Sequence, residues 1–152
     1  MLKAIAPQGF SAQFSPDNVT LGSTTLRVGT SESTSPGDYQ IILEAFGNGF
    51  LYNQTATVEV IKYLVVTIGT SFIPANLTVS AGANVTWVRL NGPLSQYDDG
   101  SHDIDFLSGS SAVSPTLAQY QSWSYTFPQA GEYNYFCKFH LFMKSEIVVL
   151  NG

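Results

Sequence analysis

Apolar and polar residues alternate with a period of two along most of the chain, and Gly, Pro, Asn and Asp separate the alternating runs. The runs are rich in β-branched and aromatic residues, and no window shows helical periodicity with capping residues. We therefore predict short strands throughout, at 10–14, 24–29, 39–46, 54–61, 64–68, 77–79, 84–88, 102–106, 122–127, 131–136 and 145–150.

A break at Lys62-Tyr63 divides this series of strands into two segments. Short strands at such regular spacing are typical of antiparallel sandwiches. The predicted fold class is thus all-β, with two tandem antiparallel Greek-key β-sandwiches at 1–62 and 63–152. In the first segment, Gly47-Asn-Gly49 between two alternating runs predicts a tight hairpin.

The first segment also carries turn-and-strand motifs at 6–10 (Ala-Pro-Gln-Gly-Phe), at 14–21 and at 36–39 (Pro-Gly-Asp-Tyr). These motifs resemble the later strands of an immunoglobulin-like surface module of bacteria or archaea. The resemblance implies a partial immunoglobulin-like module at 1–62. Such modules carry a further strand before Ala6, so we expect either that 2–5 fills this role or that the chain starts inside a domain.

Composition narrows the possible functions. Apolar residues make up 44% of the 152 residues and aromatic residues 13%, which is enough to fill packed cores and argues against disorder. The net charge of −5 is spread without basic clusters, which argues against a nucleic-acid partner. No apolar run is long enough to span a membrane. A single cysteine excludes an internal disulfide.

Several rare residue types gather in one place. The segment 137–143 holds the only cysteine, Cys137, together with His140 and Met143, and the second histidine, His102, lies upstream at the start of a predicted strand. A thiolate, two imidazoles and a thioether are the ligand types of a trigonal blue-copper site. Two predicted strands flank the segment, so the chain offers three ligands on one connection and the fourth from a separate strand. The predicted metal ligands are His102, Cys137, His140 and Met143.

Residues 63–152 resemble a cupredoxin. Gly131-Glu-Tyr-Asn-Tyr-Phe-Cys137 matches the Gly-x-Tyr-x-Tyr-x-Cys strand of that family, and Cys-x-x-His-x-x-Met is similar to the short ligand loop of its amicyanin and plastocyanin group. The resemblance implies one type 1 copper cofactor, cycling between Cu(I) and Cu(II) in one-electron transfer, and no enzymatic activity or small-molecule substrate. It also implies a redox protein donor and acceptor that dock near His140 and Phe139/Phe142, within an exported or membrane-associated redox chain or a larger membrane-bound complex.

Two positions depart from the family pattern. Asp103 stands after the first histidine, where the family often has Asn, and Lys138-Phe139 stands where a Pro often precedes the second histidine. Asp103 lacks amide donors, so we expect it to accept backbone N–H bonds near Cys137 and to favour the cupric state by its charge. Rigidity of the Lys138-Phe139 connection then has to come from packing.

The location is predicted to be periplasmic, extracellular or at the cell surface, with the chain a mature or excised segment. The start of the chain lacks the long apolar core of a signal peptide. Export agrees with the surface-type first module, the export habit of cupredoxins and the Asn-x-Thr triplets at Asn18, Asn53, Asn76 and Asn84.

Other interpretations of the site remain open at this point. Zinc accepts Cys and His but makes little use of Met, and a Cys-His hydrolase would have no role for Met143. Two histidines are too few for a trinuclear copper cluster, and one cysteine too few for a binuclear purple site. A copper-carrying or structural surface module without redox turnover is the main alternative, followed by an envelope protein that has lost its metal.

Two surface features also have alternative interpretations. The side chains of Phe139, Leu141 and Phe142 either form an apolar docking patch around His140 or pack inward. The connection at 91–100 is longer than a minimal hairpin, and it either covers the site, binds a partner or is an inserted solvent loop.

Overall fold

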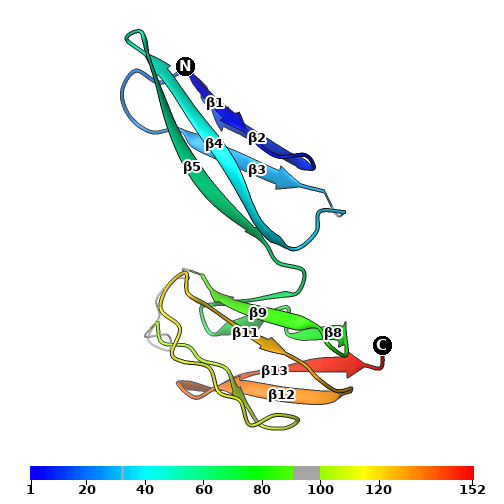
Figure 1. Cartoon of the computed structure of the whole chain (residues 1–152). Helices are drawn as coiled ribbons and strands as arrows, with labels where there is room; N and C mark the ends of the chain where they lie inside the picture. Colours follow the sequence, from blue (N-terminus) through cyan, green and yellow to red (C-terminus); the bar gives the residue numbers. More distant parts are fainter. Residues whose placement is uncertain (32, 91–99) are drawn as a thin grey trace. The chain divides into compact units, whose positions relative to one another are not determined.

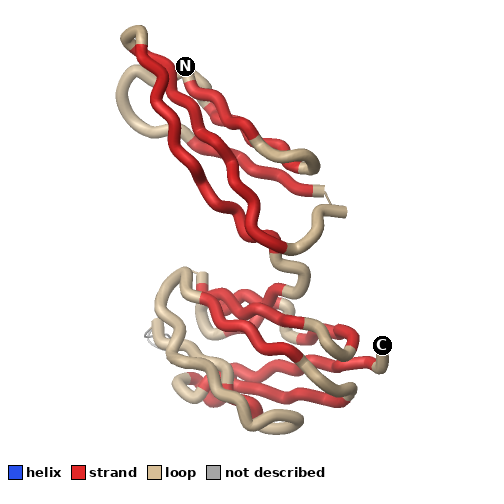
Figure 2. Tube along the Cα trace, viewed as in Figure 1, coloured by secondary structure: helices blue, strands red, loops and turns tan. Residues whose placement is uncertain are grey.

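The computed structural model describes residues 1–31, 33–90 and 100–152 of the chain. The regular elements among them are β-strands, as Figure 2 shows, and the chain folds into two compact units, Met1–Lys62 and Tyr63–Gly152. Figure 1 labels most of the strands of both units. In the described part of the chain, no helix has the length and apolar character needed to cross a membrane.

The first unit contains two antiparallel sheets. Strand β4 (Gly37–Gly47) pairs with β1 (Leu2–Ile5) on one side and β5 (Phe50–Val60) on the other, and β2 (Phe10–Ser15) pairs with β3 (Thr25–Thr30). The predicted hairpin is present: Gly47 pairs with Phe50, and Asn48 and Gly49 form the turn with φ of 53° and 79°. Positive φ at both central residues is the reason that Asn-Gly favours this kind of turn.

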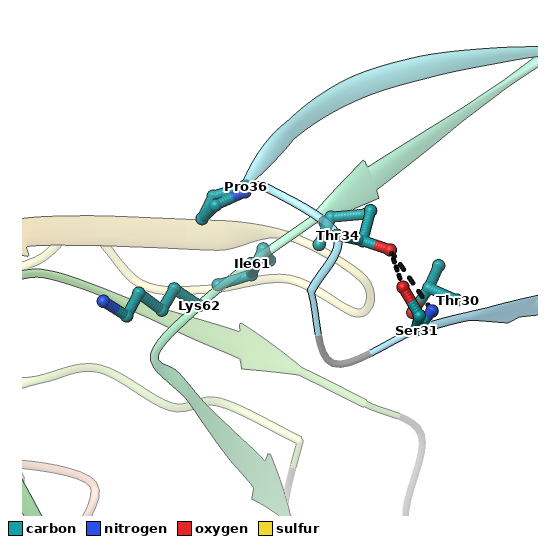
Figure 3. Close-up of a pocket in the computed structure, with 7 residues that line it drawn as sticks. Thr30, Ser31, Thr34, Pro36, Ile61 and Lys62 are labelled. Atoms are coloured by element: carbon teal, nitrogen blue, oxygen red, sulfur yellow. Dashed lines mark hydrogen bonds between the residues drawn. The ribbon is translucent and has the colours of Figure 1, made fainter. Parts of the chain in front are cut away.

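Little of the first unit is buried. Ile41 is the only hydrophobic residue among its described positions that reaches the buried class, and Phe10 packs against Tyr39 with ring centroids 4.5 Å apart. A surface pocket lies where β3 ends and β4 begins (Figure 3), and in its wall the Ser31 N–H donates to Thr34 Oγ1 at 3.2 Å. The immunoglobulin-like character of this unit remains a prediction.

The second unit is a β-sandwich of two sheets, drawn in Figure 1. One sheet runs in the order β11 (Ser122–Thr126), β9 (Asn84–Arg89), β6 (Leu64–Ile68), β7 (Ser71–Ile73). The other runs in the order β10 (Asp105–Phe106), β12 (Gly131–Cys137), β13 (His140–Leu150), β8 (Asn76–Ser80). Most neighbours are antiparallel, as predicted, but the pairs β6–β9 and β8–β13 are parallel. Alternation of apolar residues indicates which face of a strand is buried and carries no information on its direction.

An aromatic core fills the space between these sheets. Trp87 of β9 is fully buried, and its ring lies 5.4 to 6.3 Å from its aromatic neighbours, centroid to centroid. These neighbours are Phe106, Trp123, Phe127 and Tyr135. Tilted and edge-to-face ring pairs of this kind add to the free energy gained from burying apolar area. Of the candidate metal ligands, Cys137 and Met143 belong to the core cluster of this unit, and His102 and His140 are also buried.

Two strand limits differ from the prediction where candidate ligands lie. The strand expected at 102–106 is reduced to Asp105–Phe106, and the strand expected from residue 145 already begins at His140. Of the two alternatives for the start of the chain, a strand at 2–5 is present as β1. The sequence pattern missed β7, which is too short to display a clear period. Of the long connection expected at 91–100, residues 91–99 lie outside the described residues.

Candidate metal centre

The end of the β12–β13 hairpin carries three of the four candidate ligands. Cys137 is the last residue of β12, His140 is the first of β13, and the two pair across the turn made by Lys138 and Phe139. The next pair is Phe136 with Lys144, so the register shifts and residues 141–143 of β13 have no partner on β12. A shift of this kind redirects side chains locally, and here Met143 points inward while its two predecessors are exposed.

The fourth candidate, His102, is held on a separate segment. It forms an isolated β-bridge with Leu117, whose N–H donates to the His102 carbonyl at 2.7 Å. Two residues later, the Ile104 N–H donates to Ser114 Oγ at 2.8 Å. The segment around Ser114 and Leu117 therefore fixes the backbone of His102, a role that nothing in the sequence pattern indicated.

Three of the predicted ligands meet at one buried point. Cys137 Sγ lies 3.8 Å from His102 Nδ1 and 3.7 Å from His140 Nδ1. The ligand atoms of the three residues lie within 4.8 Å of one another, and their residues are at most 6% exposed. Two donors bound to one ion at about 2.0–2.3 Å, in a roughly trigonal arrangement, would be about 3.7 Å apart. The spacing therefore fits a single metal ion.

Met143 lies in the same interior. Its side chain is 3% exposed, and it belongs to the core cluster that also contains Cys137, Ile104 and Leu117. An axial thioether is a weak and distant ligand, so burial near the other three donors is what such a role requires. Its assignment as a ligand remains a prediction.

Burial raises the pKa of the Cys137 thiol, and hydrogen bonds from the backbone N–H groups of Asp103, Phe139 and His140 act in the opposite direction. The free thiol is therefore protonated at neutral pH, and a cation bound at this site would have to displace the proton. The same N–H groups stabilise a thiolate once it has formed.

Asp103 connects the two ligand segments. Its side chain is fully buried, and Oδ1 accepts a hydrogen bond from the Lys138 backbone N–H at 2.9 Å. This is the kind of contact expected from the sequence. The second oxygen, Oδ2, forms an ion pair with Lys138 Nζ at 2.8 Å, and this contact raises the pKa of the Lys138 ammonium. The negative charge of Asp103 is therefore compensated by the positive charge of Lys138.

The residues around His140 form an exposed apolar surface. Phe139 is 41% exposed, Leu141 65% and Phe142 64%, while the buried His140 ring lies 6.1 Å from the Phe142 ring, centroid to centroid. These side chains therefore do not pack inward, and their use as a docking patch remains a prediction. We call Phe139, Leu141 and Phe142 the apolar collar.

Comparisons with known proteins agree with this geometry. A family model described as a cupredoxin-like domain matches residues 41–149. Amicyanin of Paracoccus denitrificans is 31% identical over 77 residues, which cover 48% of this chain and 53% of that protein. The chain thus spans about half the length of the curated relatives it matches.

Solved structures provide similar folds. A reduced Cu(I) form of an amicyanin variant has a TM-score of 0.51 at 28% identity, and the match covers 61% of this chain and 86% of that one. A Cu-containing nitrite reductase from Thermus scotoductus SA-01 has a TM-score of 0.54 at 29% identity, covering 62% of this chain and 24% of that one.

Proposed function

Because the chain belongs to the cupredoxin-like domain family, we propose that it is a one-electron transfer protein with one type 1 copper as its cofactor. The observation that carries the proposal is the meeting of Cys137 Sγ with the Nδ1 atoms of His102 and His140 at a buried point. We assign these three residues and Met143 as the ligands. Bound copper would supply the exchange between Cu(I) and Cu(II).

The donor set favours copper over zinc. A structural zinc site uses four strong ligands, and a catalytic zinc site keeps an open position for water. Here the fourth candidate is a thioether, which copper accepts as a weak axial ligand and which is a poor ligand for zinc. Met143 is 3% exposed and lies in an apolar cluster, and such surroundings disfavour a water molecule in its place.

The protein's own residues provide rigidity and exclude water. Cys137 and His140 are fixed by the β12–β13 hairpin, and His102 is fixed by its bridge to Leu117. A site whose ligands are held by packing rearranges little when its charge changes, which is the requirement for fast electron exchange. Burial of all four side chains keeps solvent away from the thiolate.

Electron exchange needs close approach of a partner, and the apolar collar is suited to it. His140 directly follows exposed Phe139, and its ring lies 6.1 Å from the ring of exposed Phe142, so a partner that covers the collar comes near a proposed ligand. We assign the collar as the docking site of a redox protein donor and acceptor. The setting is an exported or membrane-associated redox chain outside the cytoplasm, and unit Met1–Lys62 is an immunoglobulin-like spacer or docking module.

A metal-loading experiment tests the function. The chain loaded with Cu(II) should show the intense visible band of a copper thiolate, which ascorbate bleaches and ferricyanide restores. Cys137→Ser should remove the band, whereas Val79→Thr, which places a similar hydroxyl in the core away from the ligands, should retain it.

Three outcomes would contradict the proposal: a colourless copper complex, a band that persists in Cys137→Ser, or a band that does not return on reoxidation. The last outcome would favour a copper-carrying module without redox turnover.

A further inference from the structure

A carboxylate with no exposed surface is costly to keep in a protein. Asp103 is 0% exposed, and such residues are almost never fully buried unless they are paired. Removing the partner of a buried charge is strongly destabilising because the remaining charge is left without compensation. The groups that pair with the Asp103 carboxylate therefore contribute to the stability of the site.

Both oxygens of Asp103 are engaged by a single residue. Oδ1 accepts from the Lys138 backbone N–H at 2.9 Å, and Oδ2 pairs with Lys138 Nζ at 2.8 Å. The lysine is held from a second side, because its Nζ lies 5.0 Å from the centroid of the Phe139 ring. Its side chain is 47% exposed, so the stem reaches from solvent to a buried acceptor.

The position of this pair relates it to the metal site. Asp103 directly follows His102, and Lys138 directly follows Cys137, so the two contacts join the backbones of two ligand segments that lie far apart in sequence. The Lys138-Phe139 turn has no proline to restrict it. The ion pair and the backbone hydrogen bond together supply the restriction.

We propose that Asp103 and Lys138 form a charge-matched clamp that positions the Cys137–His140 turn against the His102 segment before any metal is bound. Asp103 is a positioning residue, and Lys138 is required only because residue 103 carries a negative charge. The effect on metal binding rests on the proposed copper site, whereas the coupling between the two side chains belongs to the metal-free protein.

A double-mutant cycle on metal-free protein tests the coupling. Lys138→Gln should lower the midpoint of thermal unfolding by about 5–10 °C, because the buried carboxylate loses its partner. The same substitution in the Asp103→Asn background should cost less than half as much, since the neutral amide needs no counter-charge. Lys144→Gln removes the same charge from an exposed position next to Met143 and should leave the midpoint unchanged.

A second measurement tests positioning. Asp103→Asn keeps an oxygen that can accept the Lys138 N–H, whereas Asp103→Ala removes it. In a competition titration with a chelator, Asp103→Ala should weaken Cu(II) binding by about 10–100-fold relative to Asp103→Asn. The visible band should shift in the alanine variant and stay close to the native position in the asparagine variant.

The clamp is overturned if Lys138→Gln costs the same in both backgrounds, or if the alanine and asparagine variants bind Cu(II) equally well. These results are separable from a failure of the proposed function. A native chain without colour but with a coupled cycle would contradict only the copper proposal, and a coloured chain with an additive cycle would contradict only the clamp.

Discussion

At the residue scale, a substitution of Met143 distinguishes a role of its side chain in core packing from a role as a metal ligand. The side chain is 3% exposed and lies in the core cluster, so leucine, which has a similar volume, should cost about 1 kcal/mol or less in the free energy of unfolding. If the thioether is an axial ligand, Met143→Leu should nevertheless raise the reduction potential, because a donor that stabilises the oxidised ion is lost. Denaturant unfolding and a redox titration of the copper-loaded protein measure the two effects.

Ile147→Leu is the matched control for this substitution. Ile147 is fully buried in the same strand and is not itself a proposed ligand, so its replacement changes only the shape of a core side chain. It should have a similar small cost in stability and no effect on the potential. Equal potentials for the native chain and Met143→Leu would show that Met143 only packs the core.

The candidate ligands are visible in the sequence because they are among the rarest residue types in the chain and cluster there, and their role as ligands stays a prediction. The pairing of Asp103 with Lys138 could be predicted only in part. The sequence suggested that Asp103 accepts a backbone N–H, but the second contact depends on the path of one long side chain. The roles of Ser114 and Leu117 depend on local backbone geometry, which no residue pattern in the sequence indicates.

At the scale of elements, the connection after β10 is pressed against β12. The N–H of Leu107 donates to the Asn134 carbonyl at 2.7 Å, and Gly109 follows with a φ of +80°. A Cβ on Gly109 would lie 2.6 Å from Tyr133 Cδ1 and 3.0 Å from the Glu132 carbonyl oxygen. Only glycine permits both the backbone conformation and this close approach.

Gly109→Ala should therefore destabilise the second unit by about 2–4 kcal/mol, which combines the strain of a positive φ with a steric clash. Gly82→Ala is the matched control, since Gly82 has a φ of +85° but a Cβ there would meet no atom within 4 Å beyond its chain neighbours. It should cost about 1–2 kcal/mol from backbone strain alone. Urea unfolding followed by tryptophan fluorescence compares them, and equal costs would refute the clash.

The same scale shows where sequence patterns lose their predictive power. Period-two alternation located most strands because each sheet of the second unit has one face in the core. It failed at residues 141–143, where the register shift exposes Leu141 and Phe142 in succession and then buries Met143. The outward direction of the apolar collar follows from this shift. Because the sequence does not reveal the shift, both interpretations of these side chains were compatible with it.

At the scale of the whole molecule, the two units differ in how much they bury. The proposed ligands and the aromatic core all lie in Tyr63–Gly152, whereas Ile41 is the only buried hydrophobic residue among the described positions of Met1–Lys62. Apolar side chains near the β4–β5 turn remain exposed, with Phe46 at 54% and Phe50 at 64%. A unit of this size with so little core is expected to be marginally stable.

Fragments divided at Lys62-Tyr63 test this difference. The fragment 63–152 contains both tryptophans of the chain, Trp87 and Trp123, so their fluorescence reports on the second unit alone. Its urea midpoint and, after copper loading, its visible band should match those of the intact chain, because the ligands and their supporting contacts are internal to it. The fragment 1–62, followed by circular dichroism, should unfold at lower urea. A shifted band or a lower midpoint for 63–152 would instead mean that the first unit takes part in forming the site.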